Sequence, residues 1–121
     1  MADSREAAGH GRLSVVRTDT DGVTVVVLKG EVDHHSVKAL THVLPPARAV
    51  SAPRIVLDLT GVTFMDSSGV NALIAVHRAT EEARGWLRLV GVRGAALRTV
   101  QLVGLDLLIP CHPDLREALG Q

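Results

Sequence analysis

The chain has few aromatic side chains and no excess of charge. Phe64 and Trp86 account for the whole 2% of phenylalanine, tryptophan and tyrosine. Base stacking on aromatic rings is therefore nearly excluded, and the core must be aliphatic. The formal net charge is zero, so no broad electrostatic field attracts nucleic acid or an anionic membrane. Nucleic acid and membranes are not expected as partners.

Cysteine is almost absent as well. Cys111 is the single cysteine, so an intramolecular disulfide is impossible. Its position between Pro110 and His112 favours a small side chain at a strand end over a nucleophile. The first dozen residues lack the apolar stretch of a secretory signal, and no apolar run reaches transmembrane length. We expect a cytoplasmic protein.

The chain has enough aliphatic side chains to form the core of one domain. Its 121 residues are 46% hydrophobic, and a chain of this length buries about two-thirds of its unfolded surface. Residues 1–12 are polar and predict a flexible tail, which leaves residues 13–121 as the domain. Neutral charge and a closed α/β unit favour a monomer.

Strand and helix patterns alternate along the domain. A short apolar segment at residues 13–17 and a β-branched run at residues 23–28, separated by an Asp- and Gly-rich turn, predict a hairpin. The other expected strands cover residues 54–59, 86–90 and 107–109. Helices are expected over residues 36–44, 67–84, 95–103 and 113–119, with Pro45-Pro46 ending or kinking the first one. The predicted fold is α/β, with a mixed, mostly parallel sheet of four to five strands and about four helices.

The segment Phe64-Met65-Asp66-Ser67-Ser68-Gly69 lies where a buried strand gives way to a helix. Asp and Ser are preferred helix N-caps. A helix N-terminus also carries about half a positive charge and free N–H groups, so it accepts a phosphate. Local chemistry alone favours capping.

A helical wheel from residue 67 onward separates the two serines. Val70, Leu73, Ile74 and His77 cluster as the expected core stripe. Ser67 lies at the edge of that stripe. Ser68 falls on the other side with a face of small and polar residues, namely Asn71, Ala72, Ala75, Arg78, Ala79 and Glu82. The wheel therefore predicts that Ser68 is the more exposed hydroxyl.

Three motifs in order make the chain resemble the STAS-domain family, and within it the bacterial anti-sigma factor antagonists. The first is Leu28-Lys29-Gly30-Glu31-Val32-Asp33. The second joins the strand at residues 55–59 to the segment at residues 64–69. The third is the helix end at residues 97–105, which resembles the family's L-x-x-h-G-L pattern, where h is hydrophobic.

The resemblance implies a partner-switching cycle. The unphosphorylated antagonist binds an anti-sigma factor that is also a Bergerat-fold serine kinase, and so frees a sigma factor. The kinase, which holds the ATP, phosphorylates the second serine of the loop, here Ser68. A PP2C-type phosphatase reverses the modification. This chain would then be a substrate and ligand rather than an enzyme, with no cofactor of its own.

The same resemblance suggests which residues meet the partner. These are Asp33, Met65, Asp66, Ser67, Ser68, Gly69, Asn71 and Ala72. Alternatives remain open for two of them, because Asp33 is equally suited to capping the helix at residues 36–44 and Met65 is better suited to burial. Asp66 is expected to order the loop by capping, and Gly69 to allow close backbone approach. Asn71 and Pro45-Pro46 depart from the family pattern.

Other functions have weaker support. His34 and His35 point about 100° apart if helical and cannot easily share a metal ion. A hydrolase using Ser68 with His77 or His112 would lack the Gly-x-Ser-x-Gly elbow. The alternative within the fold is a non-phosphorylated scaffold of a stress-signalling complex or a lipid-transport system.

Overall fold

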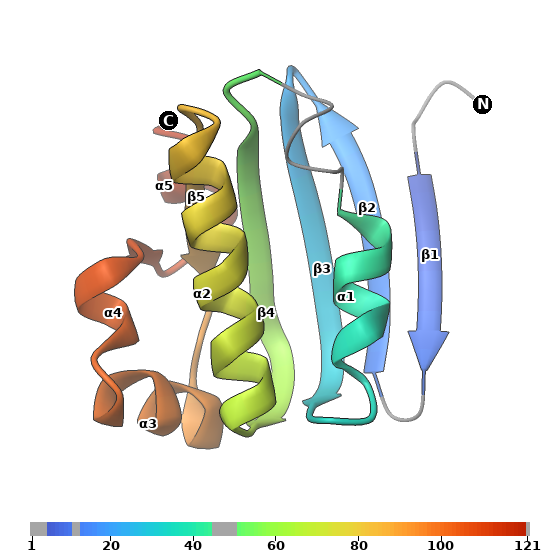
Figure 1. The fold of residues 1–121 in the computed structure, drawn as a ribbon, viewed down its shortest axis with the longest axis vertical. Helices are drawn as coiled ribbons and strands as arrows, with labels where there is room; N and C mark the ends of the chain where they lie inside the picture. Colours follow the sequence, from blue (N-terminus) through green and yellow to red (C-terminus); the bar gives the residue numbers. More distant parts are fainter. Residues whose placement is uncertain (1–4, 11–12, 45–50, 121) are drawn as a thin grey trace.

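The sheet runs across the molecule in the order of the sequence. The structure, a computed structural model, describes residues 5–10, 13–44 and 51–120. Within these ranges six strands form one sheet in the order β1 to β6, and Figure 1 shows β1 to β5 side by side. Their bounds are β1 Arg5–His10, β2 Leu13–Thr20, β3 Val23–Val32, β4 Arg54–Met65, β5 Trp86–Val90 and β6 Cys111–His112. The β1–β2 and β2–β3 pairs are antiparallel, and the remaining three pairs are parallel.

Helices lie on both faces of the sheet. Their bounds are α1 Val37–Val43, α2 Ser67–Glu82, α3 Gly94–Leu102, α4 Leu105–Leu108 and α5 Leu115–Ala118. The α1 and α2 helices lie side by side over one face, and α5 lies behind the sheet (Figure 1). The larger aliphatic cluster includes Leu40 of α1, Leu57 of β4 and Leu73 of α2. A smaller cluster, with Val56, Val90 and Ala118, lies under α5. The mixed α/β architecture is confirmed.

Several elements match the sequence-based expectation. The predicted hairpin is formed by β2 and β3, and its turn places Asp21 at φ 50° and Gly22 at φ 80°. Two successive left-handed residues match the right-handed twist of the flanking strands. The β5 strand covers the predicted residues 86–90, and α2 begins at the predicted Ser67. None of the helices within the described ranges has the length and hydrophobicity needed to span a membrane.

At residues 5–10 the structure differs from the flexible tail predicted for residues 1–12, while residues 1–4 and 11–12 lie outside the described residues. Residues Arg5–His10 form β1, which pairs along its length with β2. The sequence of this segment predicts a tail because it is polar and lacks the alternation of apolar and polar residues that marks a strand. Backbone hydrogen bonds to a neighbouring strand do not need that alternation, and an unpaired β2 edge would offer them.

The prediction of an edge strand at residues 107–109 is wrong. These residues belong to the α4 region, and the edge strand is Cys111–His112. Gly104, at φ 73°, ends α3 and lets the chain restart as a helix. Leu105 and Ile109 are then buried one helical turn apart, while Leu107 is 90% exposed.

Two further helix boundaries were only partly predicted. The last helix, α5, starts after Asp114, whose carboxylate accepts a hydrogen bond from Glu117 N at 2.9 Å. Pro113 therefore precedes the cap instead of occupying the first turn. The first helix, α1, ends at Val43, and Pro45-Pro46 lie outside the described residues.

Candidate partner-binding site

The predicted loop lies at the junction of β4 and α2, where Asp66 is the N-cap of the helix. Asp66 Oδ1 accepts hydrogen bonds from the backbone N–H of Ser68 at 2.9 Å and of Gly69 at 3.2 Å. These bonds satisfy two donors that the first turn of a helix otherwise leaves free. The prediction that Asp66 orders the loop by capping is confirmed.

The turn between β3 and α1 is built around Asp33 and Ser36. Asp33 Oδ1 accepts from the backbone N–H of His35 and of Ser36, each at 3.0 Å. Ser36 is only 2% exposed, and its hydroxyl donates to Glu31 O at 2.7 Å. The same hydroxyl oxygen accepts from Asp33 N at 2.9 Å. The turn is thus held by side chains at both of its ends.

These contacts set the acidity of Asp33. Desolvation raises the pKa of its carboxyl group, but hydrogen bonds outweigh it. They come from the Ser36 side chain and from the backbone of Ser36 and His35, and the nearby charge of His35 adds to them. The net effect lowers the pKa of Asp33 below its ordinary value, because every one of these groups favours the charged form. Asp33 therefore caps the turn that precedes α1, whereas the N-cap of α1 itself is Ser36, so the predicted N-cap role of Asp33 is wrong.

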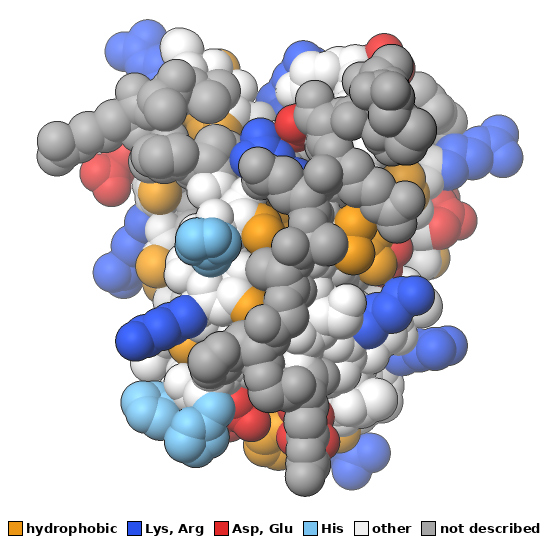
Figure 2. Space-filling model, turned by 90° about the vertical axis from the view of Figure 1, so that its right-hand side faces the viewer, with side chains coloured by type: hydrophobic (Ala, Val, Ile, Leu, Met, Phe, Trp, Pro, Cys, Tyr) orange, Lys and Arg blue, Asp and Glu red, His pale blue; other side chains and the backbone are white. Residues whose placement is uncertain are grey.

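One hydrogen bond joins this turn to the start of α2. The backbone N–H of His34 donates to Asp66 Oδ2 at 3.3 Å, and Asp66 N donates to Val32 O at 3.1 Å. Residues separated by more than 30 positions in the sequence thus form one continuous surface region. Viewed from the side of β1, histidine and acidic side chains gather at one end of the molecule (Figure 2). The sequence predicted Asp33 and Asp66 in this region, but it did not predict the contact made by His34.

Three of the predicted partner contacts are buried. Met65 is 2% exposed and Ala72 is 8% exposed, and Gly69 is buried between β3 and β4. A Cβ atom on Gly69 would lie 2.6 Å from Met65 Cγ. For Met65, burial was the better supported of its two predicted roles, and it is confirmed. The side chains of Met65 and Ala72 offer almost no exposed area to a partner. The close approach predicted at Gly69 is confirmed.

The predicted order of serine exposure is also wrong. Ser67 is exposed, whereas Ser68 is half-buried. The buried stripe of α2 is centred on Leu73, Val76 and Thr80, while His77 lies at its margin. The wheel gave no weight to small residues, yet Gly69, Ala72 and Thr80 belong to the buried side of α2, whereas Ala75 is exposed. Of the two hydroxyl groups, that of Ser67 is therefore the more accessible. Ser67 lies one helical turn before Asn71, which is also exposed.

Ser36 is the site residue that the sequence analysis missed. The sequence pattern predicts it only as the start of the first helix. The signal that could have identified its role is the spacing Asp33-x-x-Ser36, because Asp and Ser side chains at such spacing bond to each other's backbone N–H groups. Its burial depends on the tertiary structure and has no local signature.

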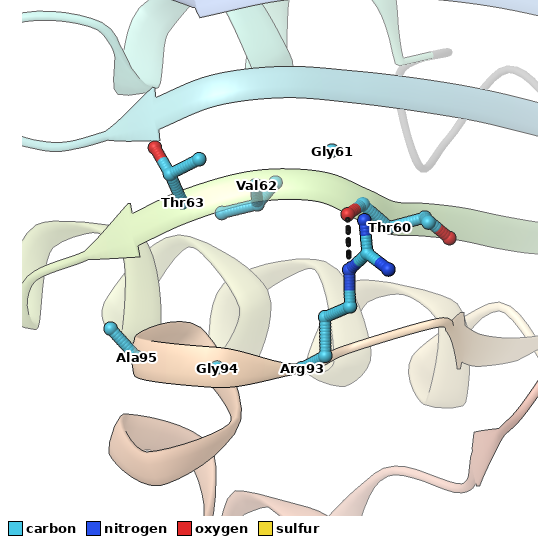
Figure 3. A pocket seen from close by; sticks show the side chains of 7 residues that line it. All are labelled: Thr60, Gly61, Val62, Thr63, Arg93, Gly94 and Ala95. Atoms are coloured by element: carbon cyan, nitrogen blue, oxygen red, sulfur yellow. Dashed lines mark hydrogen bonds between the residues drawn. The ribbon is translucent and has the colours of Figure 1, made fainter.

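A separate hollow lies between β4 and the start of α3. It has a volume of about 360 Å³ and is lined by Thr60, Gly61, Val62, Thr63, Arg93, Gly94 and Ala95. Arg93 Nε donates to Thr60 O at 3.2 Å across it (Figure 3). Within the described residues, no group of three or more His, Cys, Asp or Glu side chains is arranged to hold a metal ion.

Comparisons with known proteins agree on one family. The family model of the STAS domain matches residues 14–118. The chain is 28% identical over 101 residues to an anti-sigma F factor antagonist of Paenibacillus polymyxa, covering 83% of this chain and 86% of that protein. It is 29% identical over 93 residues to an anti-sigma-B factor antagonist of Staphylococcus aureus, covering 77% and 86%. An anti-sigma factor antagonist from Mycobacterium paratuberculosis has a similar solved structure, with a TM-score of 0.76, 32% identity, and coverage of 89% and 92%.

Proposed function

This chain belongs to the STAS-domain family, and we propose that it is an anti-sigma factor antagonist switched off by phosphorylation at the start of α2. In the proposed cycle the unphosphorylated chain binds an anti-sigma factor and thereby frees a sigma factor. The anti-sigma factor is a Bergerat-fold serine kinase that holds the ATP. A PP2C-type phosphatase restores the active form. The names of the similar proteins from Paenibacillus and Staphylococcus support the first step of this cycle.

The observation that carries the proposal is the placement of Ser67. It is exposed and occupies the first position of α2, directly after the N-cap Asp66. The neighbouring turn with Asp33 is fixed to the same helix start through Asp66. A kinase that docks on this surface therefore meets an accessible hydroxyl on a rigid support.

We place the modification at Ser67 although the family resemblance mapped it to Ser68. A kinase must reach the hydroxyl oxygen with the terminal phosphate of its nucleotide, which requires an accessible side chain. Ser67 is exposed, whereas Ser68 is half-buried and its backbone N–H is engaged by Asp66. Ser68 remains the alternative acceptor and is tested separately below.

Phosphorylation is sufficient to dissociate such a complex. It adds a charge of about −1.5 to −2 together with three acceptor oxygens. A phosphate about 6 Å from one fixed negative charge of a partner loses roughly 3 kcal/mol per charge unit at an effective dielectric of about 20. That is a loss of about a hundredfold in affinity. No catalytic group of this chain is needed, so we propose that it is a substrate and ligand and not an enzyme.

The test is intact-mass analysis of the purified chain after incubation with ATP, Mg²⁺ and candidate Bergerat-fold kinases of the same genome. We expect one added phosphate on the unaltered chain and on Ser68→Ala, and none on Ser67→Ala. Circular dichroism of both variants provides the folding control.

Other outcomes are equally informative. A phosphate lost in Ser68→Ala and kept in Ser67→Ala would move the site to Ser68 while retaining the switch. A kinase that binds the chain tightly and transfers nothing would overturn the switch. The scaffold of a stress-signalling complex or lipid-transport system would then be the better function.

A further inference from the structure

Four large aliphatic side chains are exposed where α3 ends and α4 begins. Leu102 is 82% exposed and Leu107 is 90% exposed. Val103 and Leu108 are exposed by 56% and 48%. Single exposed leucines are common on protein surfaces, but a group of them in one short segment is typical of a surface that another molecule covers.

A turn at Gly104 joins these side chains into one surface, the α3–α4 patch, which consists of Leu102, Val103, Leu107 and Leu108. Gly104 has φ 73°, and its carbonyl oxygen accepts from Leu107 N at 3.1 Å. A Cβ atom on Gly104 would lie 4.0 Å from Leu107 Cδ1, so the side chain of Leu107 extends back toward the end of α3. Figure 1 shows α3 and α4 at the edge of the molecule opposite β1.

The patch adds little to the packing of a single chain. Val100 of α3 is buried in the main aliphatic cluster, together with Leu105 and Ile109 at the two ends of α4. These three side chains attach both helices to the core. The patch lies on the outward side of the same segment. Removing its apolar area from water is favourable, and this requires a second molecule.

Two opposite charges flank the patch. Arg98 is exposed one turn before Leu102 in α3, and Asp106 is exposed beside Leu107 in α4. Among the residues that the structure describes, neither charged side chain forms a salt bridge. In a two-fold dimer every contact occurs twice, with the roles of the two copies exchanged. An apolar patch with a cation at one end and an anion at the other is therefore complementary to itself.

We propose that the α3–α4 patch is the interface for a second copy of this chain, related by a two-fold axis. The leucines of the two copies pack against each other, and Arg98 of each copy faces Asp106 of the other. The formal net charge of zero leaves no long-range repulsion between the copies. The sequence favoured a monomer because its pattern does not show that Leu102 and Leu107 face outward. This inference concerns residues 98–108 and does not rest on the proposed function.

The size of the patch indicates the strength of the dimer. Four exposed aliphatic side chains supply about half of the roughly 800 Å² that each partner buries in a standard interface. Interfaces below the standard size are typically weak and reversible. We therefore expect a Kd of about 10–100 µM, so that the chain is a monomer when dilute and a dimer when concentrated.

The first test is sedimentation velocity of the whole chain from about 2 to 500 µM. We expect the average mass to rise from the monomer value of 12.8 kDa toward twice that value. Leu107→Glu changes an exposed position and should weaken the dimer at least about tenfold. The control, Thr41→Glu, adds the same charge to an exposed position of α1 and should dimerise like the unaltered chain. A monomer throughout, or an equal loss in both variants, would overturn the proposal.

The second test exchanges the two charges. Arg98→Asp alone and Asp106→Arg alone each place like charges face to face, and each should weaken the dimer about three- to tenfold. The double variant restores opposite charges in exchanged positions and should recover most of the affinity. Circular dichroism of all three variants provides the folding control. A double variant weaker than either single variant would overturn the two-fold arrangement.

A different protein on the patch would give a separate result. Candidate kinases are mixed with the unaltered chain and with Leu107→Glu, and binding is measured by calorimetry. We expect equal affinity, because the patch serves a second copy of the chain. If Leu107→Glu loses kinase binding while the unaltered chain alone stays monomeric, the second copy is overturned as the occupant.

Discussion

Gly69 at the start of α2 lies against Val32 at the end of β3, so that a Cβ atom on Gly69 would come within 2.9 Å of Val32 Cγ1. The same Cβ would lie 3.1 Å from the backbone oxygen of Val32. The helix start therefore rests directly on the strand that leads into the turn with Asp33. The serine loop and this turn are neighbours because position 69 has no side chain.

Gly69→Ala is expected to destabilise the fold. In an unhindered helix interior this change stabilises by roughly 0.5–1 kcal/mol. Here the added methyl group meets Met65 and the backbone of Val32, so we expect a net cost of about 1–3 kcal/mol. Urea unfolding followed by circular dichroism measures it. A stabilised Gly69→Ala variant would show that the helix start is not in close contact with β3.

Substitutions at buried and at exposed residues of the predicted site should differ in how much folding stability they cost. Met65→Ala removes a buried side chain and should cost about 2–5 kcal/mol. Asn71→Ala changes an exposed position and should stay within about 0.5 kcal/mol. Thermal unfolding of the two variants side by side checks this. A loss in Asn71→Ala as large as that in Met65→Ala would contradict the exposed placement of Asn71 on α2.

Ser36→Ala should raise the pKa of Asp33. The Ser36 hydroxyl group is the first of the contacts that lower this pKa, and its removal also leaves Asp33 N without a partner. NMR titration of the side-chain carboxyl carbon measures the midpoint in both proteins. We expect it below 3.8 in the unaltered chain and closer to 3.8 in the variant. Equal midpoints would rule out Ser36 as the cause.

The same shift predicts how stability depends on pH. Because the folded-state pKa of Asp33 lies below its ordinary value, its carboxylate contributes fully to stability above that value. The contribution is lost as the pH falls through the lowered folded pKa. The stability difference between the unaltered chain and Asp33→Asn should therefore be constant at pH values well above 3.8, the ordinary value, and shrink in stronger acid as the lowered folded pKa is passed. Denaturant midpoints across this range provide the measurement.

Arg88 is expected to hold α5 and the single tryptophan together. Its guanidinium carbon lies 3.8 Å from the centre of the Trp86 ring, and its Nη1 donates to Ala118 O at the end of α5. Arg88→Ala should cost about 1–2 kcal/mol and shift Trp86 emission to longer wavelength as the ring becomes more hydrated. The exposed Arg98→Ala serves as the control. An unchanged spectrum in Arg88→Ala would contradict this stacking.

The sequence alone determined the parts of the fold that depend on local chemistry. The β2–β3 hairpin followed from an apolar segment and a β-branched run on either side of an Asp-Gly turn, and β5 followed from a short strand pattern at residues 86–90. The cap at Asp66 followed from residue type and position. These features need only neighbouring residues, since turn conformation and capping are set within a few positions.

Only the tertiary structure decided which face of each helix packs against the sheet and which distant segments are in contact. Small residues such as Ala72 and Thr80 carry little periodic signal, so only contact with the sheet showed that they face it and that Ser67 points outward. The edge strand β1 formed through backbone pairing that leaves no mark in side-chain pattern. The bond from His34 to Asp66 joins two loops whose proximity arises from parallel pairing of β3 and β4. Contacts between distant segments require the whole sheet, because register and close packing are set only when the elements assemble.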